Sequence, residues 1–291
     1  MSDDAMTPKK RASPLIEIRD LETIEDLRRV ERVEQEVWKL TDRDVTPMTL
    51  LIACKEAGAM VIGALDGDEL IGFAFGFPAL EHGQVSIHSH MLAVLPQYRD
   101  LNLGYKLKLA QRERALAMGI RHMTWTFDPL QSRNAHFNFA KAGVVSNRYK
   151  VDLYGRDSSS VLHQNGTDRL WVTWPLASER VKRRLKGEGP GPRPDARVLV
   201  RLGQNGCPEQ NELSSALKEA RALIEIPANI LAMEANDSKL AWQWRLATRW
   251  AFTELLRREF FVAEFFRGDD PQAPGCYLLV AKKMEDFVPD F

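Results

Sequence analysis

The stretch from Val94 to Gly104, VLPQYRDLNLG, constrains the fold more than any other part of this chain. An apolar strand pattern leads into it and the basic amphipathic run KLKLAQRERALAMG follows it, so the order is strand, short loop, helix. Arg99, Asn102 and Gly104 mark the loop with the spacing Arg-x-x-Asn-x-Gly. Such a turn leaves the first backbone N–H groups of the helix without intrahelical partners, which is a ready site for a phosphate or diphosphate.

The elements around this loop alternate between strand and helix. Ahead of it, hydrophobic periodicity predicts strand, two helices and three strands, at 15–19, 23–40, 46–58, 59–65, 70–77 and 84–94. After it, the pattern predicts a helix to about Gly119, a strand at 121–127, a helix at 132–141 and strands at 146–154 and 170–174. This alternation predicts an α/β fold built on a mixed sheet with helices on both faces.

Composition shifts divide the chain into parts. Residues 1–13 are polar and without periodicity, which predicts a disordered tail. We expect one domain at 14–176, a charged and Gly/Pro-rich linker at 177–196, and a smaller α/β module at 197–291. In that module the pattern predicts a helix at 212–223. The helix–strand–strand ending of the second module echoes that of the first, so it is either a degenerate half-copy without the diphosphate loop or an unrelated helix–hairpin unit.

Charge and cysteine content exclude several classes of protein. Lys+Arg and Asp+Glu both number 40, so no net field favours nucleic acid or an anionic membrane. No apolar run has the length of a membrane span, and the N-terminus lacks a signal-peptide core. The three cysteines are far apart and form neither a metal spacing nor a disulfide framework. We therefore expect a cytoplasmic protein without metal, nucleic-acid or membrane partners.

The loop and its flanks resemble the acyl-CoA diphosphate loop of the GNAT acetyltransferase superfamily. That family's pattern is Arg/Gln-x-x-Gly-x-Gly/Ala, and Arg99, Asn102 and Gly104 occupy its three marked positions. Asn102 replaces the first glycine, and asparagine enters the left-handed backbone region more easily than most residues. RHMTWTF at 121–127 and SRNAHFNFAKAG at 132–143 resemble the family's fifth strand and fourth helix. The resemblance runs from about residue 15 to 175 and implies a GNAT-like, mostly antiparallel sheet.

The resemblance also implies a set of residues that bind acetyl-CoA or another acyl-CoA. The backbone of the strand before the loop would hold the pantetheine arm, the loop and first helical turn would hold the diphosphate, and asparagines of the fourth helix would reach the pantetheine amides. These positions are Leu92, Ala93, Val94, Arg99, Asp100, Leu101, Asn102, Leu103, Gly104, Tyr105, Lys106, Asn134 and Asn138. Lys108 and Arg112, further along the helix, would either meet phosphates or form a solvated helix face.

Candidate catalytic side chains lie on the same strand and beyond it. His88 and His90 share one face because side chains alternate along a strand. Either could accept the proton of an amine, or both could be hydrogen-bonded structural histidines. Family members often place an acidic tyrosine in the fourth helix, but here that position is Phe139. Tyr149 and Tyr154, expected on the next strand, either take over its role of helping the thiolate leave or pack as strand aromatics, and Tyr154 is the candidate we name.

The resulting expectation is an N-acyltransferase that moves an acyl group from an acyl-CoA directly to an amine. Direct transfer is expected because no nucleophilic Cys or Ser with a neighbouring base is evident. The acceptor would be the amine of a small molecule or a peptide, and the second module would cover the acceptor site or form a homodimer interface. The alternative is a GNAT-fold protein that binds acyl-CoA, or only keeps the shape, without turnover.

Overall fold

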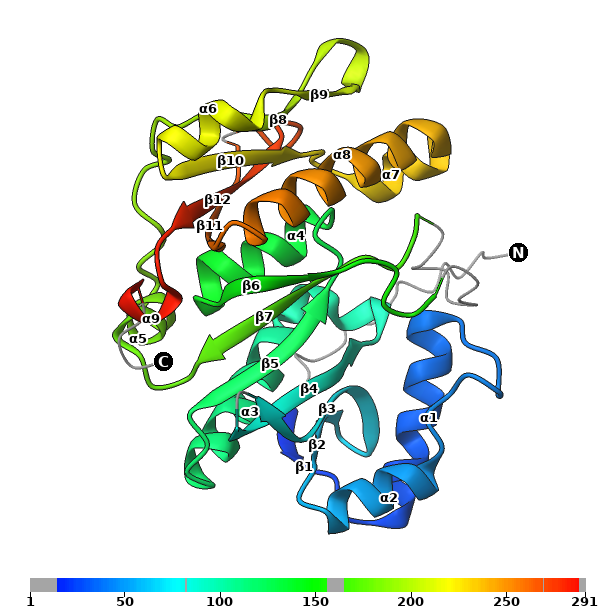
Figure 1. Cartoon of the computed structure of the whole chain (residues 1–291). Coiled ribbons are helices and arrows are strands. Elements are labelled where there is room, and N and C mark those ends of the chain that lie inside the picture. Colours follow the sequence, from blue (N-terminus) through cyan, green and yellow to red (C-terminus); the bar gives the residue numbers. More distant parts are fainter. Residues whose placement is uncertain (1–14, 82, 156–164, 269, 288–291) are drawn as a thin grey trace, which may run out of the picture.

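One continuous sheet runs through the molecule. The computed structural model describes residues 15–81, 83–155, 165–268 and 270–287. Within these ranges the sheet has twelve strands in the order β1-β2-β3-β4-β5-β7-β6-β11-β12-β10-β8-β9 (Figure 1). Only the β4–β5 and β8–β10 pairs are parallel. The expected mixed, mostly antiparallel sheet is confirmed.

The first half of the chain supplies the strands from β1 to β6 in this order, together with the helices that connect them. They are β1 (Ile16–Asp20), α1 (Ile24–Trp38), α2 (Met48–Glu56), β2 (Met60–Asp66), β3 (Glu69–Glu81), β4 (Gln84–Val94), the 3-10 helix η1 (Pro96–Leu101), α3 (Leu103–Ala117), β5 (His122–Phe127), α4 (Ser132–Ala135), the π-helix η2 (His136–Ala142), β6 (Val145–Lys150) and β7 (Arg169–Pro175).

The second half supplies the rest. Its elements are α5 (Glu179–Leu185), β8 (Val198–Leu202), the 3-10 turn η4 (Gln204–Gly206), β9 (Pro208–Gln210), α6 (Leu213–Lys218), β10 (Arg221–Ile226), α7 (Ile230–Asn236), α8 (Ser238–Leu256), β11 (Phe260–Phe266), β12 (Gly275–Ala281) and α9 (Met284–Phe287).

Local chemistry explains several element boundaries. The Thr23 side chain accepts a hydrogen bond from the Asp26 N–H, and the Asp26 carboxylate accepts one from the Thr23 N–H, which closes a capping box at the start of α1. Strands β2 and β3 turn within two residues, because Asp66 already pairs with Glu69. Gly67 lies in that turn at φ 58°, where a residue without Cβ is unstrained.

Helices cover both faces of the first half of the sheet. Trp38 of α1 packs edge to face on Phe73 of β3, with ring centroids 6.1 Å apart. Phe77, on the same side of β3, contacts the ring of His88 on β4. The next residue, Ser89, points to the opposite side, toward α3. We call these two sides the α1 face and the α3 face.

The second half repeats the connectivity of part of the first. In the first half, β4 and β5 are parallel, a helix follows β5, and β7 of the closing β6–β7 hairpin inserts next to β5. In the second, β8 and β10 are parallel, α8 follows, and β12 of the β11–β12 hairpin inserts next to β10. The two units join edge to edge where Val262 of β11 pairs antiparallel with Ser146 of β6.

Helix α8 fastens the two halves through buried ion pairs. The guanidinium of Arg245 donates to both oxygens of Asp128, at 2.8 and 2.7 Å, and its side chain is fully buried. One turn on, Arg249 donates twice to the carboxylate of Asp168, at 2.8 Å each. Asp128 and Asp168 flank the ends of β5 and β7, so they hold α8 against the first half of the chain.

Two boundaries differ from the expected ones. The strand expected at 146–154 ends at Lys150, and the following four residues form turns. The helix that the pattern extends from residue 212 to 223 stops at Lys218, and β10 begins at Arg221. The proposed linker contains α5, and the sheet continues past it, while the division into domains stays a prediction. The tail expected at 1–13 lies outside the described residues.

Candidate functional site

Strands β4 and β5 separate after only two paired positions. Ile87 pairs with Met123 and His88 with Thr124, and no further pair joins the two strands in the described chain. The β4 backbone from Ser89 to Val94 therefore faces a gap on its β5 side, and Leu92, Ala93 and Val94 lie within it. A strand edge without a partner can bind an extended ligand as an added strand. We call this opening the fork.

A β-bulge on β4 lies at the fork. Phe75 of β3 pairs with Met91 and the next residue, Gly76, pairs with Ser89, so His90 is the extra residue. A Cβ atom on Gly76 would lie 3.2 Å from the carbonyl oxygen of His88, which explains the glycine opposite the bulge. Bulges re-aim backbone and side-chain groups and recur beside active sites.

The segment from Arg99 to Gly104 forms the loop and helix start that the sequence predicts. Asn102 adopts the left-handed conformation, with φ 56° and ψ 26°, between η1 and α3. Its side chain makes no capping hydrogen bond. The backbone N–H of Lys106 donates a hydrogen bond of 3.2 Å to the Asn102 carbonyl. The amides between them hold the positions that an α-helix leaves without an intrahelical partner.

The remaining predicted loop residues surround these amides. The last turn of η1 and the first turn of α3 supply exposed side chains from Arg99, Asp100, Leu101 and Lys106, half-buried Gly104 and Tyr105, and buried Leu103. Tyr105 contacts Phe137 of η2 edge to face, with ring centroids 6.1 Å apart. The start of α3 therefore lies against the helix expected to flank a bound cofactor.

The two histidines lie on the α1 face of the fork. His88 is 8% exposed, and its Nδ1 atom lies 3.0 Å from the Thr124 hydroxyl. Its ring packs on Trp171 of β7, with centroids 4.7 Å apart. Burial lowers the pKa of His88 to about 4, so the ring is neutral at pH 7. His90 is exposed beside it, 6.3 Å away between ring centroids.

Tyr154 lies further along the same face. Its hydroxyl is 3.5 Å from the Thr126 hydroxyl, and the Arg169 guanidinium lies 5.3 Å from the ring centroid. Thr124 and Thr126 are neighbours on one side of β5, about 7 Å apart along the strand. The structure therefore brings Tyr154 and His88 to the same surface, although they are 66 residues apart in the numbering.

Two predicted asparagines differ in their surroundings. Asn138 is buried, and its Oδ1 atom accepts a hydrogen bond of 3.2 Å from the indole of Trp125. Asn134, one turn earlier, is exposed. Phe139 is fully buried, and Tyr277 of β12 packs against it with ring centroids 5.8 Å apart. Tyr277 donates its hydroxyl proton to the Pro129 carbonyl at 2.7 Å, so it is occupied structurally.

The structure buries Lys108, which the sequence placed either at the phosphates or on a solvated helix face, so both of these expectations are wrong. It is 5% exposed, with its Nζ atom 2.6 Å from the Ser89 hydroxyl, 3.2 Å from Gln111 Oε1 and 4.0 Å from the ring centroid of Trp125. Burial lowers the pKa of this lysine to about 7. Its only sequence signal is its place directly after buried Leu107, which does not distinguish it from a lysine at the edge of a solvated face.

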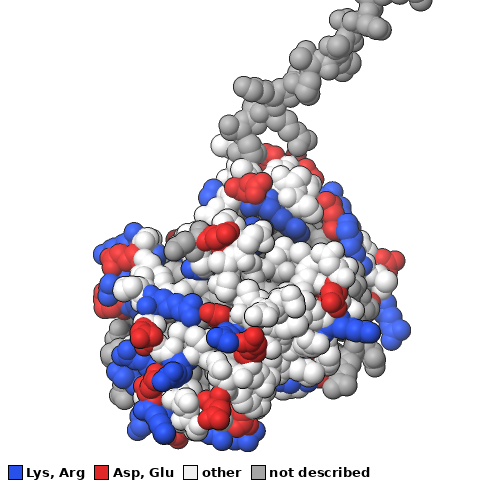
Figure 2. Space-filling view, turned by 90° about the horizontal axis from the view of Figure 1, so that it is seen from above, with Lys and Arg blue, Asp and Glu red and all other residues white. Residues whose placement is uncertain are grey.

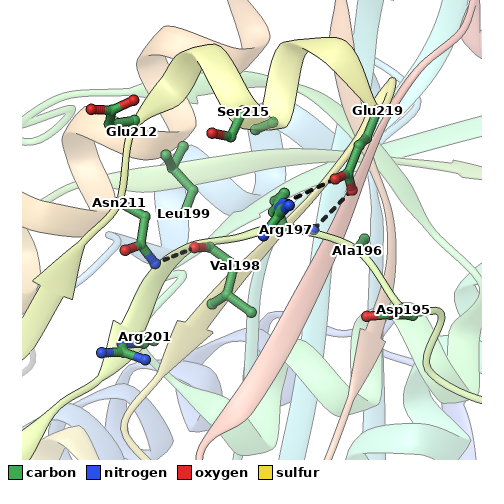
Figure 3. Close-up of a pocket in the computed structure, with 11 residues that line it drawn as sticks. Asp195, Ala196, Arg197, Val198, Leu199, Arg201, Asn211, Glu212, Ser215 and Glu219 are labelled. Carbon is green, nitrogen blue, oxygen red and sulfur yellow. Dashed lines mark hydrogen bonds and ion pairs between the residues drawn. The ribbon is translucent and has the colours of Figure 1, made fainter.

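A hollow lies in the other half of the chain. It has a volume of about 690 Å³ and lies between β8 and α6, the elements that correspond in connectivity to β4 and α3 (Figure 3). Its polar groups bind one another: Arg197 pairs with Glu219, and Asn211 donates to the Val198 carbonyl. It has no histidine or lysine in its lining, so we do not assign the chemistry there.

The surface and the described residues add three facts. On the face seen from above, basic and acidic side chains alternate, as the equal charge counts lead one to expect (Figure 2). Among the described residues, no helix combines the length and the apolarity that crossing a bilayer requires. Within the same ranges, no three His, Cys, Asp or Glu side chains gather as a metal site would need.

Comparison with known proteins identifies the first half of the chain. Residues 21–143 match the model of the acetyltransferase (GNAT) family. No curated protein matches the sequence. Three solved structures are similar over its first half: a GNAT-family protein of Desulfovibrio desulfuricans (16% identity, 56% of this chain and 99% of that one, TM-score 0.46), the ribosomal-protein-S18-alanine N-acetyltransferase of Escherichia coli (15%, 56% and 94%, 0.45), and the PaiA N-acetyltransferase of Thermoplasma acidophilum in complex with coenzyme A (20%, 55% and 98%, 0.37). On the family match, this chain carries a GNAT acetyltransferase-family domain over residues 21–143.

Proposed function

We propose that this protein is an N-acyltransferase that uses acetyl-CoA or another acyl-CoA and transfers the acyl group directly to an amine. The observation that carries the proposal is the succession of two backbone features along one stretch of chain. The fork leaves the β4 backbone open, and the strand leads through η1 into the uncapped start of α3. An extended arm and the diphosphate attached to it need these two kinds of backbone site in this order.

The residues of the loop would bind the nucleotide part of the cosubstrate. Backbone N–H groups of residues 103–105 would donate to the diphosphate, where the helix dipole also favours negative charge. Arg99 and Lys106 are exposed beside them and would pair with phosphate oxygens. Leu92, Ala93 and Val94 would bind the pantetheine arm through their backbone. Of the two candidate asparagines, Asn134 is the exposed one and would hydrogen-bond the amides of the arm.

The α1 face of the fork would receive the amine. His90 is exposed and His88 is neutral, so either ring can accept the proton that the attacking amine loses. Phe77 and Trp171 flank the histidines and would exclude water from the reacting atoms. Tyr154 bounds this surface on the β5 side. The side chains that border this surface would determine which acceptor binds, a small-molecule amine or a peptide amine.

The setting of the protein is part of the same proposal. Cys54, Cys207 and Cys276 are all free thiols. Free thiols persist in reducing compartments, which supports a cytoplasmic enzyme. For the second half of the chain we propose a supporting role, since its helix α8 is tied to the ends of β5 and β7.

A second candidate function is acyl-CoA binding without turnover, and Phe139 favours it. The position that carries an acidic tyrosine in many family members is here a buried phenylalanine. The two functions make different predictions for the same experiment.

Calorimetry with CoA and acetyl-CoA at millimolar concentration tests the binding site, and thiol release from acetyl-CoA with a panel of primary amines tests turnover. Binding with release is the expected result. Binding without release for every amine would support the second candidate, and absence of binding would refute both.

A further inference from the structure

Lys108 lies at the point where the two strands of the fork part. The last pair joining β4 and β5 is His88 with Thr124. Ser89 and Trp125 are the next residue on each strand, and both point to the α3 face. The Nζ atom of Lys108 is 2.6 Å from the Ser89 hydroxyl and 4.0 Å from the Trp125 ring centroid. Its ammonium group therefore spans the closed end of the fork.

No carboxylate pairs with this ammonium group in the part of the chain that the structure describes. Its polar partners are neutral, namely the Ser89 hydroxyl and the Gln111 amide oxygen. The nearest titratable group across the sheet is His88, whose pKa the Lys108 charge helps to lower. Lysine is rarely buried without a partner, because the charge loses its hydration. A buried, unneutralised cation is a group ready for an anion.

The reaction under "Proposed function" creates an anion at that place. An arm laid along β4 from the start of α3 runs from Val94 toward Ser89, about 17 Å for five residues of strand. That length is comparable with an extended pantetheine arm, so the sulfur atom would reach the closed end of the fork. The departing thiolate needs a proton there, and Phe139 cannot give one.

We propose that Lys108 is the acid of the acyl transfer and donates its proton to the sulfur atom of the departing CoA. This proposal rests on the proposed N-acyltransferase function. The amine nitrogen bonds to the thioester carbonyl carbon, and the C–S bond breaks with its electron pair on sulfur. A proton moves from Lys108 Nζ to that sulfur, which leaves a neutral thiol and a neutral lysine.

The proton balance closes through solvent. The proton that the amine nitrogen loses passes to His90 or to water on the α1 face. Lys108 regains a proton from water after CoA leaves. Burial lowers the pKa of Lys108 to about 7, below the value of about 8.5 for an ordinary thiol. Transfer from this ammonium to a thiolate is therefore downhill.

Calorimetry with CoA and with desulfo-CoA tests the contact without any acceptor. If the ammonium faces the sulfur, the wild type binds CoA roughly 10- to 100-fold more tightly than desulfo-CoA, as a charge-assisted hydrogen bond would give. Lys108→Met binds the two ligands equally, and Lys108→Arg keeps part of the difference because it keeps the charge. Lys141→Met, an exposed lysine on η2, is the matched control and behaves as wild type.

Turnover separates the acid from a merely positive group. With any amine that releases thiol, Lys108→Arg and Lys108→Met both lose kcat by about 100-fold or more, because guanidinium does not give up its proton. The wild-type kcat falls at high pH as Lys108 loses its proton, and this basic limb is absent from Lys108→Arg.

Each result has one meaning. Equal wild-type affinity for CoA and desulfo-CoA overturns the role of Lys108, while CoA binding as such still supports the site. Failure to bind either ligand overturns the proposed function itself. Retention of kcat in Lys108→Arg, or an acetyl group on Lys108 found by mass spectrometry, shows that the lysine is not the proton donor. The comparison of CoA with desulfo-CoA on the wild type still tests the contact between Lys108 and the sulfur atom if Lys108→Met does not fold.

Discussion

Replacing Gly104 by glutamate separates the stability of the loop at 99–104 from its proposed use. Gly104 is the second residue of α3 and its φ is not in the left-handed region. A Cβ atom built there meets only the Leu92 side chain, at 3.4 Å, which is an ordinary van der Waals contact. The backbone therefore accepts a side chain at this position, and glutamate adds a carboxylate to the first turn of α3, which is the turn proposed to bind the diphosphate.

The two effects have opposite signs. Glutamate is a better helix former than glycine, and a negative charge in the first turn of a helix is stabilising by about 0.3–1 kcal/mol, so the free energy of unfolding stays equal or rises. The same carboxylate repels the diphosphate from the amides, which costs one or two charge-assisted hydrogen bonds of about 1.5–3 kcal/mol each. We expect Gly104→Glu to weaken CoA binding by roughly 10- to 1,000-fold.

Calorimetry with CoA and urea unfolding of the same preparations measure both quantities. Gly189→Glu adds the same charge in a loop where a Cβ meets nothing within 4 Å, and this matched control keeps wild-type affinity. Pantetheine, which lacks the diphosphate, should bind Gly104→Glu and wild type alike. A Gly104→Glu variant that binds CoA within twofold of the wild type refutes the diphosphate site at the start of α3.

Three further predictions follow from the buried charges and the histidines. Burial raises the pKa of Glu34 to about 7 from 4.5. The folded state thus holds a proton between pH 4.5 and 7 that the unfolded state has lost. This contribution is full below pH 4.5 and lost as the pH rises through 7, at most about 3 kcal/mol. Urea unfolding should show this decline in wild type but not in Glu34→Gln, and equal slopes for both would contradict it. Arg245→Met leaves Asp128 buried without its partner and should cost about 3–5 kcal/mol of unfolding free energy, whereas a loss below 1 kcal/mol by the same assay would show that the pair does not fasten α8. His90→Ala should leave stability within about 0.5 kcal/mol and lower kcat by roughly 100-fold or more. Unchanged kcat would remove His90 from the proposed machinery.

The sequence carries the local features of this site better than the distant ones. The left-handed turn at Asn102 and the start of α3 follow from residue types within a few positions of each other, and the structure has both. The same holds for the β2–β3 turn at Gly67. These features depend on backbone preferences that a short stretch of chain determines by itself.

Local sequence patterns do not predict the features that depend on tertiary neighbours. Helical periodicity extends past residue 218, but Ala220 takes φ 52° and the next residues pair with β12, so strand pairing overrides the helix pattern. The burial of Lys108 depends on Ser89 and Trp125, which reach it from two other strands. The ion pair between Asp128 and Arg245 joins residues 117 positions apart, so no local pattern predicts it.

A crystal structure of the protein grown with CoA tests the central claim most directly. We predict electron density for the diphosphate at the backbone amides of residues 103–105, the pantetheine arm along β4, and the sulfur atom within hydrogen-bonding distance of Lys108 Nζ. Density for CoA elsewhere, such as the hollow between β8 and α6, or a fork that stays closed to the ligand, would contradict the account.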